Sequence, residues 1–163
     1  MVKVKEQTKI IGHVKAELFK PGTDILVAVE EGDNVIGSKG ADAITNGLDT
    51  GTIATFNYMA ISAATTPDPA VRATTTVPGS MTPTITKFMS TVINPSVDNT
   101  TPTSKISWVF TFTAASGRTA IKQFGMETTD TGSGDCFNTY IFAVVKDNTN
   151  NDLKLTYTVS VAP

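Results

Sequence analysis

Two side chains in the sequence are of the kinds that enzymes use for proton transfer and nucleophilic attack: the one histidine, His13, and the one cysteine, Cys136. A Ser-His-Asp arrangement needs a positioned histidine, but His13 stands with Lys15 and Glu17 on the polar side of an alternating segment, where a solvated surface side chain is expected. The Gly-x-Ser-x-Gly motif of many hydrolases does not occur. Cys136 opens an apolar segment, which favours a buried, unreactive thiol. We therefore expect no catalytic residues and no enzymatic activity.

Two acidic loops, 130–135 and 147–152, carry the Asp, Asn and Thr oxygens that could bind a hard cation such as Ca²⁺. Neither loop has the Asp-x-Asp-x-Asp-Gly spacing, and neither ends in a glutamate that could bind a cation through both oxygens. The ordinary alternative is turn chemistry, in which Asp and Asn side chains bind their own backbone. We expect turn chemistry, with no metal and no cofactor, and a cation at either loop is the alternative left open.

Charge and composition exclude several classes of protein. The 13 basic and 15 acidic residues give a net charge of −2, whereas nucleic-acid-binding modules usually carry a basic patch and a high pI. The chain has no run of 18 apolar residues, and its N-terminus lacks the continuous apolar segment of a signal peptide. One cysteine excludes an internal disulfide and a multi-thiolate zinc site. We expect neither a nucleic-acid partner nor a membrane partner.

The elements that would position these residues are predicted to be strands, since threonine, with 28 copies, favours them. Unbroken alternation predicts half-buried strands at 10–18, 106–112 and 153–161. Further strands are predicted at 25–29, 56–62, 85–93, 120–127 and 136–145. The strand at 25–29 is expected to pair back as a hairpin. The strand at 136–145 is expected to be central in its sheet, and a hairpin turn at 147–151 is expected to join it to the strand at 153–161. Ser38 can cap a helix that ends near Leu48. The predicted fold class is all-β, an antiparallel β-sandwich of about eight strands with one short helix.

Three regions outside the clear strands are candidates for contacts. Residues 1–9 are predicted to be a polar N-terminal arm ahead of a single domain, 10–163, and Lys3, Lys5 and Lys9 of this arm are the candidate partner-binding residues. The polar segment 63–84 is predicted to be a long loop, and residues 94–104 a second one; loops as long as the first usually bind something or are flexible. Only 17% of residues are charged, so the Thr-rich outward faces are expected to form an interface, where charges are costly.

The order of several segments resembles a known group of proteins. Asp33-Asn34-Val35-Ile36-Gly37 leads through Gly40–Leu48 into Phe56-Asn57-Tyr58-Met59-Ala60-Ile61-Ser62, followed by Thr65-Thr66-Pro67 and Arg72. The second half has the aromatic segment Trp108–Phe112, then Thr119-Ala120-Ile121 to Gly125-Met126, a Gly/Asp loop and the closing Leu155-Thr156-Tyr157-Thr158-Val159. This order, over residues 30–161, resembles small β-sandwich structural proteins of tailed bacteriophages, of the decoration or tail type. It departs from them at Ser62, where glycine is common, and in the length of the loop after Arg72.

The resemblance implies a non-enzymatic virion component, assembled in the host cytoplasm. The leading hypothesis is a capsid decoration (cement) protein that stabilises a phage head by bridging capsomers near the local threefold axes. Its partners would be the major capsid protein or other virion proteins. A homo-oligomer, with a trimer favoured, would bury the low-charge faces. The alternatives are a tail, baseplate or fibre-attachment protein of the virion and, from another class, a carbohydrate-binding or adhesive module.

Overall fold

The computed structural model describes residues 9–34, 36–50, 58–62, 96–98, 104–127 and 136–162. In this part of the chain strands predominate and one helix is present, as the all-β prediction requires. The elements in order are β1 (Lys9–Phe19), β2 (Leu26–Asn34), α1 (Ser38–Thr50), β3 (Tyr58–Ser62), β4 (Ser96–Asp98), β5 (Ser104–Phe112), β6 (Ile121–Glu127), β7 (Cys136–Lys146) and β8 (Asp152–Ala162).

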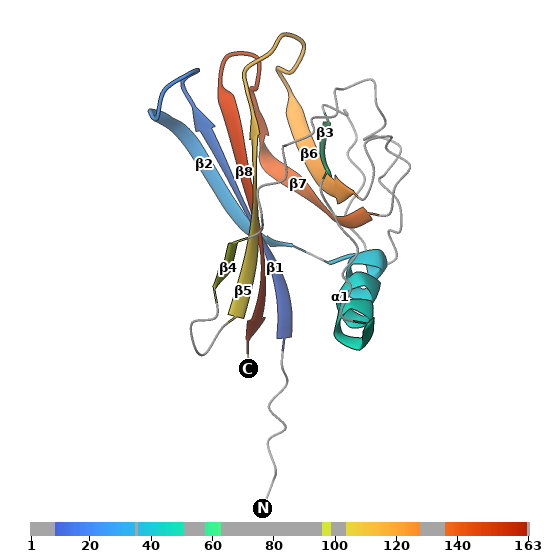
Figure 1. Ribbon diagram of the computed structural model, residues 1–163. Helices are drawn as coiled ribbons and strands as arrows, with labels where there is room; N and C mark the ends of the chain where they lie inside the picture. The colour runs from blue at the N-terminus through green and yellow to red at the C-terminus, as the bar shows by residue number, and fades with distance from the viewer. Residues whose placement is uncertain are drawn as a thin grey trace, which may run out of the picture.

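The strands form two antiparallel sheets (Figure 1). The first has five strands in the order β2-β1-β8-β5-β4, and the second has three in the order β3-β6-β7. The predicted hairpin between β1 and β2 is confirmed, with Gly22 in its turn at φ 67°, a left-handed conformation that glycine adopts without strain. Within the described residues, β2 therefore has a hydrogen-bonded neighbour, β1, on one side only.

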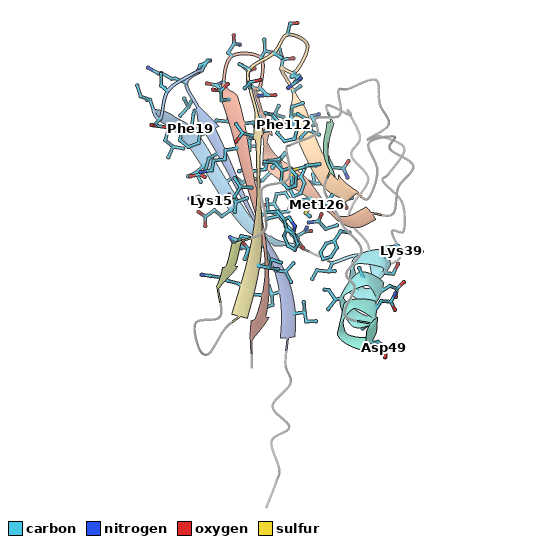
Figure 2. The ribbon with its side chains drawn as sticks, viewed as in Figure 1. Lys15, Phe19, Lys39, Asp49, Phe112 and Met126 are labelled. Atoms are coloured by element: carbon cyan, nitrogen blue, oxygen red, sulfur yellow. The ribbon has the colours of Figure 1, made fainter. Side chains whose placement is uncertain are left out.

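The core is formed by the apolar side of each alternating strand. Leu153, Leu155 and Tyr157 of β8 are fully buried, in one cluster with Phe112 of β5 and Met126 of β6. Figure 2 shows Phe112 and Met126 between the two sheets and Lys15 on the opposite face of the five-stranded sheet. The period-2 patterns therefore correctly predict which face of β1, β5 and β8 is buried.

Three predictions about connections and strand positions are wrong. Residues 147–151 do not close a hairpin, because β7 and β8 belong to different sheets. The apolar run 136–145 predicted a central strand, but β7 is an outer strand of the described three-stranded sheet. The polar segment 94–104, predicted to be a loop, contains β4, whose short pairing with β5 uses backbone groups and needs no apolar side chains. The predicted strand 85–93 and the predicted loop 63–84 lie outside the described residues.

Helix α1 contacts β7 at a point where a glycine is required. The backbone N–H of Gly37, just before the helix, donates to the carbonyl of Phe137 at 2.9 Å. A Cβ on Gly40 would lie 2.6 Å from the same carbonyl oxygen. This contact is with backbone, so the neighbouring atoms cannot swing away as the end of a flexible side chain can.

We expect Gly40→Ala to lower the free energy of unfolding by about 1–3 kcal/mol, because the added methyl group overpacks this contact. This loss of stability is opposite in sign to the usual effect of Gly→Ala in a helix, where alanine is about 1 kcal/mol more favourable than glycine. Urea denaturation measures the difference, with Asp42→Ala on the exposed side of the same helix as the control. An increase in stability for Gly40→Ala would show that α1 does not pack this closely on β7.

Candidate interaction surface

Strand β2, which has one neighbour among the described strands, carries several exposed apolar side chains. Leu26, Val27 and Val29 are each about half exposed (50%, 51% and 50%), as is Ile25 just before the strand. The run Ile25–Val29 has the composition of a buried strand, but β2 is the outer strand of its sheet. Its pairing with β1 is also irregular here, since Leu18 is opposite Ala28 whereas Phe19 is opposite Leu26, which leaves Val27 as an extra residue.

A second exposed apolar segment lies beside β2, in an interruption of β7. Ile121 of β6 is opposite Lys146, but Gln123 is opposite Ile141, so β7 leaves the ladder between these two points. The interruption exposes Val144 (66%) and Val145 (43%). We call the set Ile25, Leu26, Val27, Val29, Val144 and Val145 the β2 edge surface.

Glu30 connects the two parts of this surface. Its carboxylate accepts hydrogen bonds from the backbone N–H groups of Ala143 (2.7 Å) and Val144 (3.3 Å), and it forms an ion pair with Lys146. The Tyr140 hydroxyl donates to the same carboxylate at 3.4 Å. Both charged side chains are nearly buried, with 13% of Glu30 and 4% of Lys146 exposed. One carboxylate on β2 therefore holds the interrupted part of β7 in place.

The charges of this cluster influence each other. Burial opposes ionisation of Glu30, but the hydrogen bonds from Lys146, Ala143 and Val144 outweigh it, so the pKa of Glu30 lies below its ordinary value. Burial and the nearby Glu30 charge raise the pKa of Tyr140. Glu30 is therefore a carboxylate, and Tyr140 a neutral hydrogen-bond donor, at neutral pH.

The loop 147–152, considered above as a cation site, shows the predicted turn chemistry. The Asp147 carboxylate accepts from the backbone N–H groups of Thr149 (2.9 Å) and Asn150 (3.3 Å) and from Asn150 Nδ2 (2.9 Å). The bond from the Asn150 side chain is the main cause that lowers the pKa of Asp147. Among the described residues no group of three or more His, Cys, Asp or Glu side chains is placed to hold a metal ion. The loop 130–135 lies outside the described residues.

The remaining sequence candidates that the structure describes are His13 and Lys9 on β1 and Cys136 on β7. His13 lies on the outward face of β1, 3.1 Å from a carboxylate oxygen of Asp33. Cys136 is the first residue of β7. Lys9 is the first residue of β1, where its backbone is opposite Ala162, while Lys3 and Lys5 lie outside the described residues. The Thr-rich outward face is seen in β8, where Thr158 and Ser107 of β5 hydrogen bond at 2.9 Å.

Reasoning from the sequence did not identify the β2 edge surface. The signal available was the apolar run Ile25–Val29, which does not alternate and directly follows a turn, but such a run also fits a strand buried on both faces.

No helix in the described part of the chain is long and apolar enough to span a membrane. A scan against protein-family models, a search of curated proteins and a search of solved structures each returned no match.

Proposed function

We propose that this chain is a non-enzymatic structural protein of a bacteriophage virion, a capsid decoration (cement) protein that bridges neighbouring capsomers of the head. The single observation that carries the proposal is the β2 edge surface. A long outer strand with apolar side chains presents both unpaired backbone groups and hydrophobic area, and natural proteins normally cover or charge such edges. Its exposure in the isolated chain indicates a function in assembly with other chains.

The proposed fold suits this function. We propose that the two sheets form an antiparallel β-sandwich of about eight strands, as in the phage proteins that the sequence resembles. A rigid domain of this kind can present an edge to a partner without large rearrangement. Many copies with individually modest contacts would together reinforce a shell, and a homo-oligomer, with a trimer favoured, would cover the remaining low-charge faces.

The position of Trp108 favours a virion protein over a carbohydrate-binding or adhesive module. Sugar-binding modules usually display exposed aromatic rings, which are partly apolar and partly polar. Trp108, the one tryptophan in the sequence, is only partly exposed and packs against Tyr157 and Phe137, with ring centroids 6.1 Å from each. Its ring contributes to the core between the sheets.

The copy number of the protein in purified virions tests the proposal. Quantitative mass spectrometry against the major capsid protein is expected to give a ratio approaching one copy per capsid subunit. A much smaller number would place the protein in the tail, the baseplate or a fibre attachment and contradict the decoration assignment. Absence from particles would refute a virion function altogether.

The β2 edge surface can be tested in the same particles. We expect the double substitution Val27→Lys and Val29→Lys to lower occupancy on virions by about tenfold or more, because it places charges in a desolvated contact. The matched control is Thr111→Lys with Thr119→Lys, which adds the same charge at two exposed positions away from β2. Equal occupancy of the two variants would contradict the assignment of the surface.

A further inference from the structure

We infer that the open edge of β2 from Val29 to Asp33, at one end of the β2 edge surface, binds the N-terminal arm, residues 1–8, of a second copy of this chain, added as a further strand beside β2. The inference rests on the proposed function in that it names a partner for the same surface.

The two sides of β2 differ in character. The register with β1 places Val29, Glu31 and Asp33 on the outward face and Ala28, Glu30 and Gly32 on the core side. The side chains of Glu31 and Asp33 are 52% and 81% exposed. Strand β2 itself has no lysine or arginine, and the nearest basic groups lie on β1, where Lys15 is 3.9 Å from Glu31 and His13 is 3.7 Å from Glu31 and 3.1 Å from Asp33. A strand that complements the outward face of β2 must carry basic groups at every second position.

The arm has this pattern. Val2 and Val4 alternate with Lys3 and Lys5, so that in an extended strand the two valines share one face and the two lysines share the other. The spacing of two residues matches that of Glu31 and Asp33 on β2. Opposite charges directly across a pair of strands stabilise the pairing.

Val4 has the same partner on β2 whether the arm runs parallel or antiparallel to that strand. If Lys3 and Lys5 are opposite Glu31 and Asp33 in either order, Val4 is opposite Gly32. Gly32 has no side chain, and a Cβ at this position would lie 2.5 Å from the Tyr140 hydroxyl. The apolar face of the arm is then on the core side of β2, the side on which Glu30 holds Val144. In this register residues 1–8 reach Val29 when the arm is parallel and Ala28 when it is antiparallel, so the arm covers the Glu30 end of the β2 edge surface and leaves Ile25, Leu26 and Val27 exposed.

The arm cannot reach this position on its own chain. Gly12 of β1 is opposite Asn34, and Val14 is opposite Gly32, so Lys9 lies five residues along β1 from the level of Gly32. That is about 17 Å along the strands, with about 10 Å more across β1 and β2 to the outer edge. The five residues from Lys9 back to Val4 span at most about 18 Å when fully extended, which is less than the direct separation of about 20 Å. The arm must therefore come from another copy.

Two copies that exchange arms reciprocally would form a closed twofold dimer, whereas an arm that binds the β2 edge of the next copy makes a heterologous contact. Such contacts generate closed rings when the rotation closes and open filaments when it does not. A ring of three copies is the arrangement that agrees with the trimer favoured for the proposed function. In this ring each arm would pair with the Val29–Asp33 part of a β2 strand.

The test uses purified full-length protein and sedimentation velocity over a concentration series. We expect the full chain to form an oligomer, and a variant lacking residues 2–8 to be a monomer that still unfolds cooperatively, with a melting temperature that does not depend on protein concentration. Lys3→Glu with Lys5→Glu should weaken assembly by about tenfold or more, and adding Glu31→Lys with Asp33→Lys should restore it. The matched control, Lys105→Glu with Lys122→Glu, makes the same change of charge on β5 and β6 and should assemble normally. A monomeric full chain, or an oligomer that survives the deletion, would overturn the inference.

Hydrogen exchange gives a second readout that needs no substitution in β2, where Glu31 and Asp33 also contact His13. Backbone amides of residues 29–33 should exchange more slowly in the full-length oligomer than in the arm-deleted chain. Protection that appears on another element instead would overturn the assignment to β2. These measurements contain no virions, so the two proposals can fail separately. If the protein assembles but is absent from particles, only the proposed function is refuted. If the protein is abundant in virions but assembles without its arm, only this inference is refuted.

Discussion

Substituting Glu30 with alanine is expected to lower the free energy of unfolding by about 3–5 kcal/mol, the usual cost of leaving one member of a buried ion pair without its partner. Lys146 is 4% exposed and would lose its anionic partner. The backbone N–H groups of Ala143 and Val144 would lose their acceptor at the same time. Chemical denaturation with urea measures the loss directly.

A double variant separates the cost of the unpaired charge from the value of the pair itself. Glu30→Gln with Lys146→Met removes both charges and keeps an oxygen that can accept from the β7 backbone. We expect it to be more stable than Glu30→Gln alone, because buried ion pairs contribute little compared with neutral replacements of similar volume. A loss below about 1 kcal/mol for Glu30→Ala, typical of an exposed pair, would contradict the burial of this cluster.

The same carboxylate makes stability depend on pH in a defined direction. The folded-state pKa of Glu30 is lowered from the ordinary value of 4.5, so its contribution is fully present above that value and is lost as the pH falls through the lowered folded-state pKa. The difference in unfolding free energy between the wild type and Glu30→Gln should therefore shrink between about pH 7 and about pH 3. A difference that stays constant over this range would show that Glu30 keeps an ordinary pKa in the folded protein.

The second large effect is expected at Asn148, which is fully buried. Its Nδ2 donates to the carbonyls of Phe112 (2.9 Å) and Asn151 (2.8 Å), and its Oδ1 accepts from Arg118 Nη1 (3.0 Å). Its backbone N–H also donates to the carbonyl of Arg118 at 2.9 Å. One side chain therefore fixes the end of β5, the turn that follows it and the turn between β7 and β8, which lie together at one end of the molecule (Figure 1).

We expect Asn148→Ala to cost about 2–4 kcal/mol, since several buried polar groups lose their partners together. Asn148→Asp should also destabilise, because a carboxylate cannot donate to the two carbonyls. The control is Asn150→Ala in the same turn, whose exposed side chain bonds only Asp147 among the hydrogen bonds described, with an expected effect below about 1 kcal/mol. Equal losses for the two alanine variants, measured by thermal and urea denaturation, would contradict this account.

Local patterns in the sequence determined much of this fold. The unbroken alternation of β1, β5 and β8 places Leu155, Tyr157 and Phe112 in the core, because successive side chains of a strand point to opposite faces. The turn at Pro21-Gly22 and the short helix from Ser38 follow from residues whose backbone preferences are strong and local. The Asp147 turn follows in the same way, since its side chain bonds groups two and three residues away.

Only the tertiary structure decided which strands are neighbours and which edges remain open. The run Ile25–Val29 has the same composition whether its strand is central or outer, and its exposure depends on the absence of a second neighbour beyond β2 in the described sheet. The Glu30–Lys146 pair joins residues 116 positions apart, and the interruption of β7 exists only relative to its register with β6. Hydrophobic periodicity specifies the face that a strand buries, but strand order is set by long-range pairing, which no local pattern encodes.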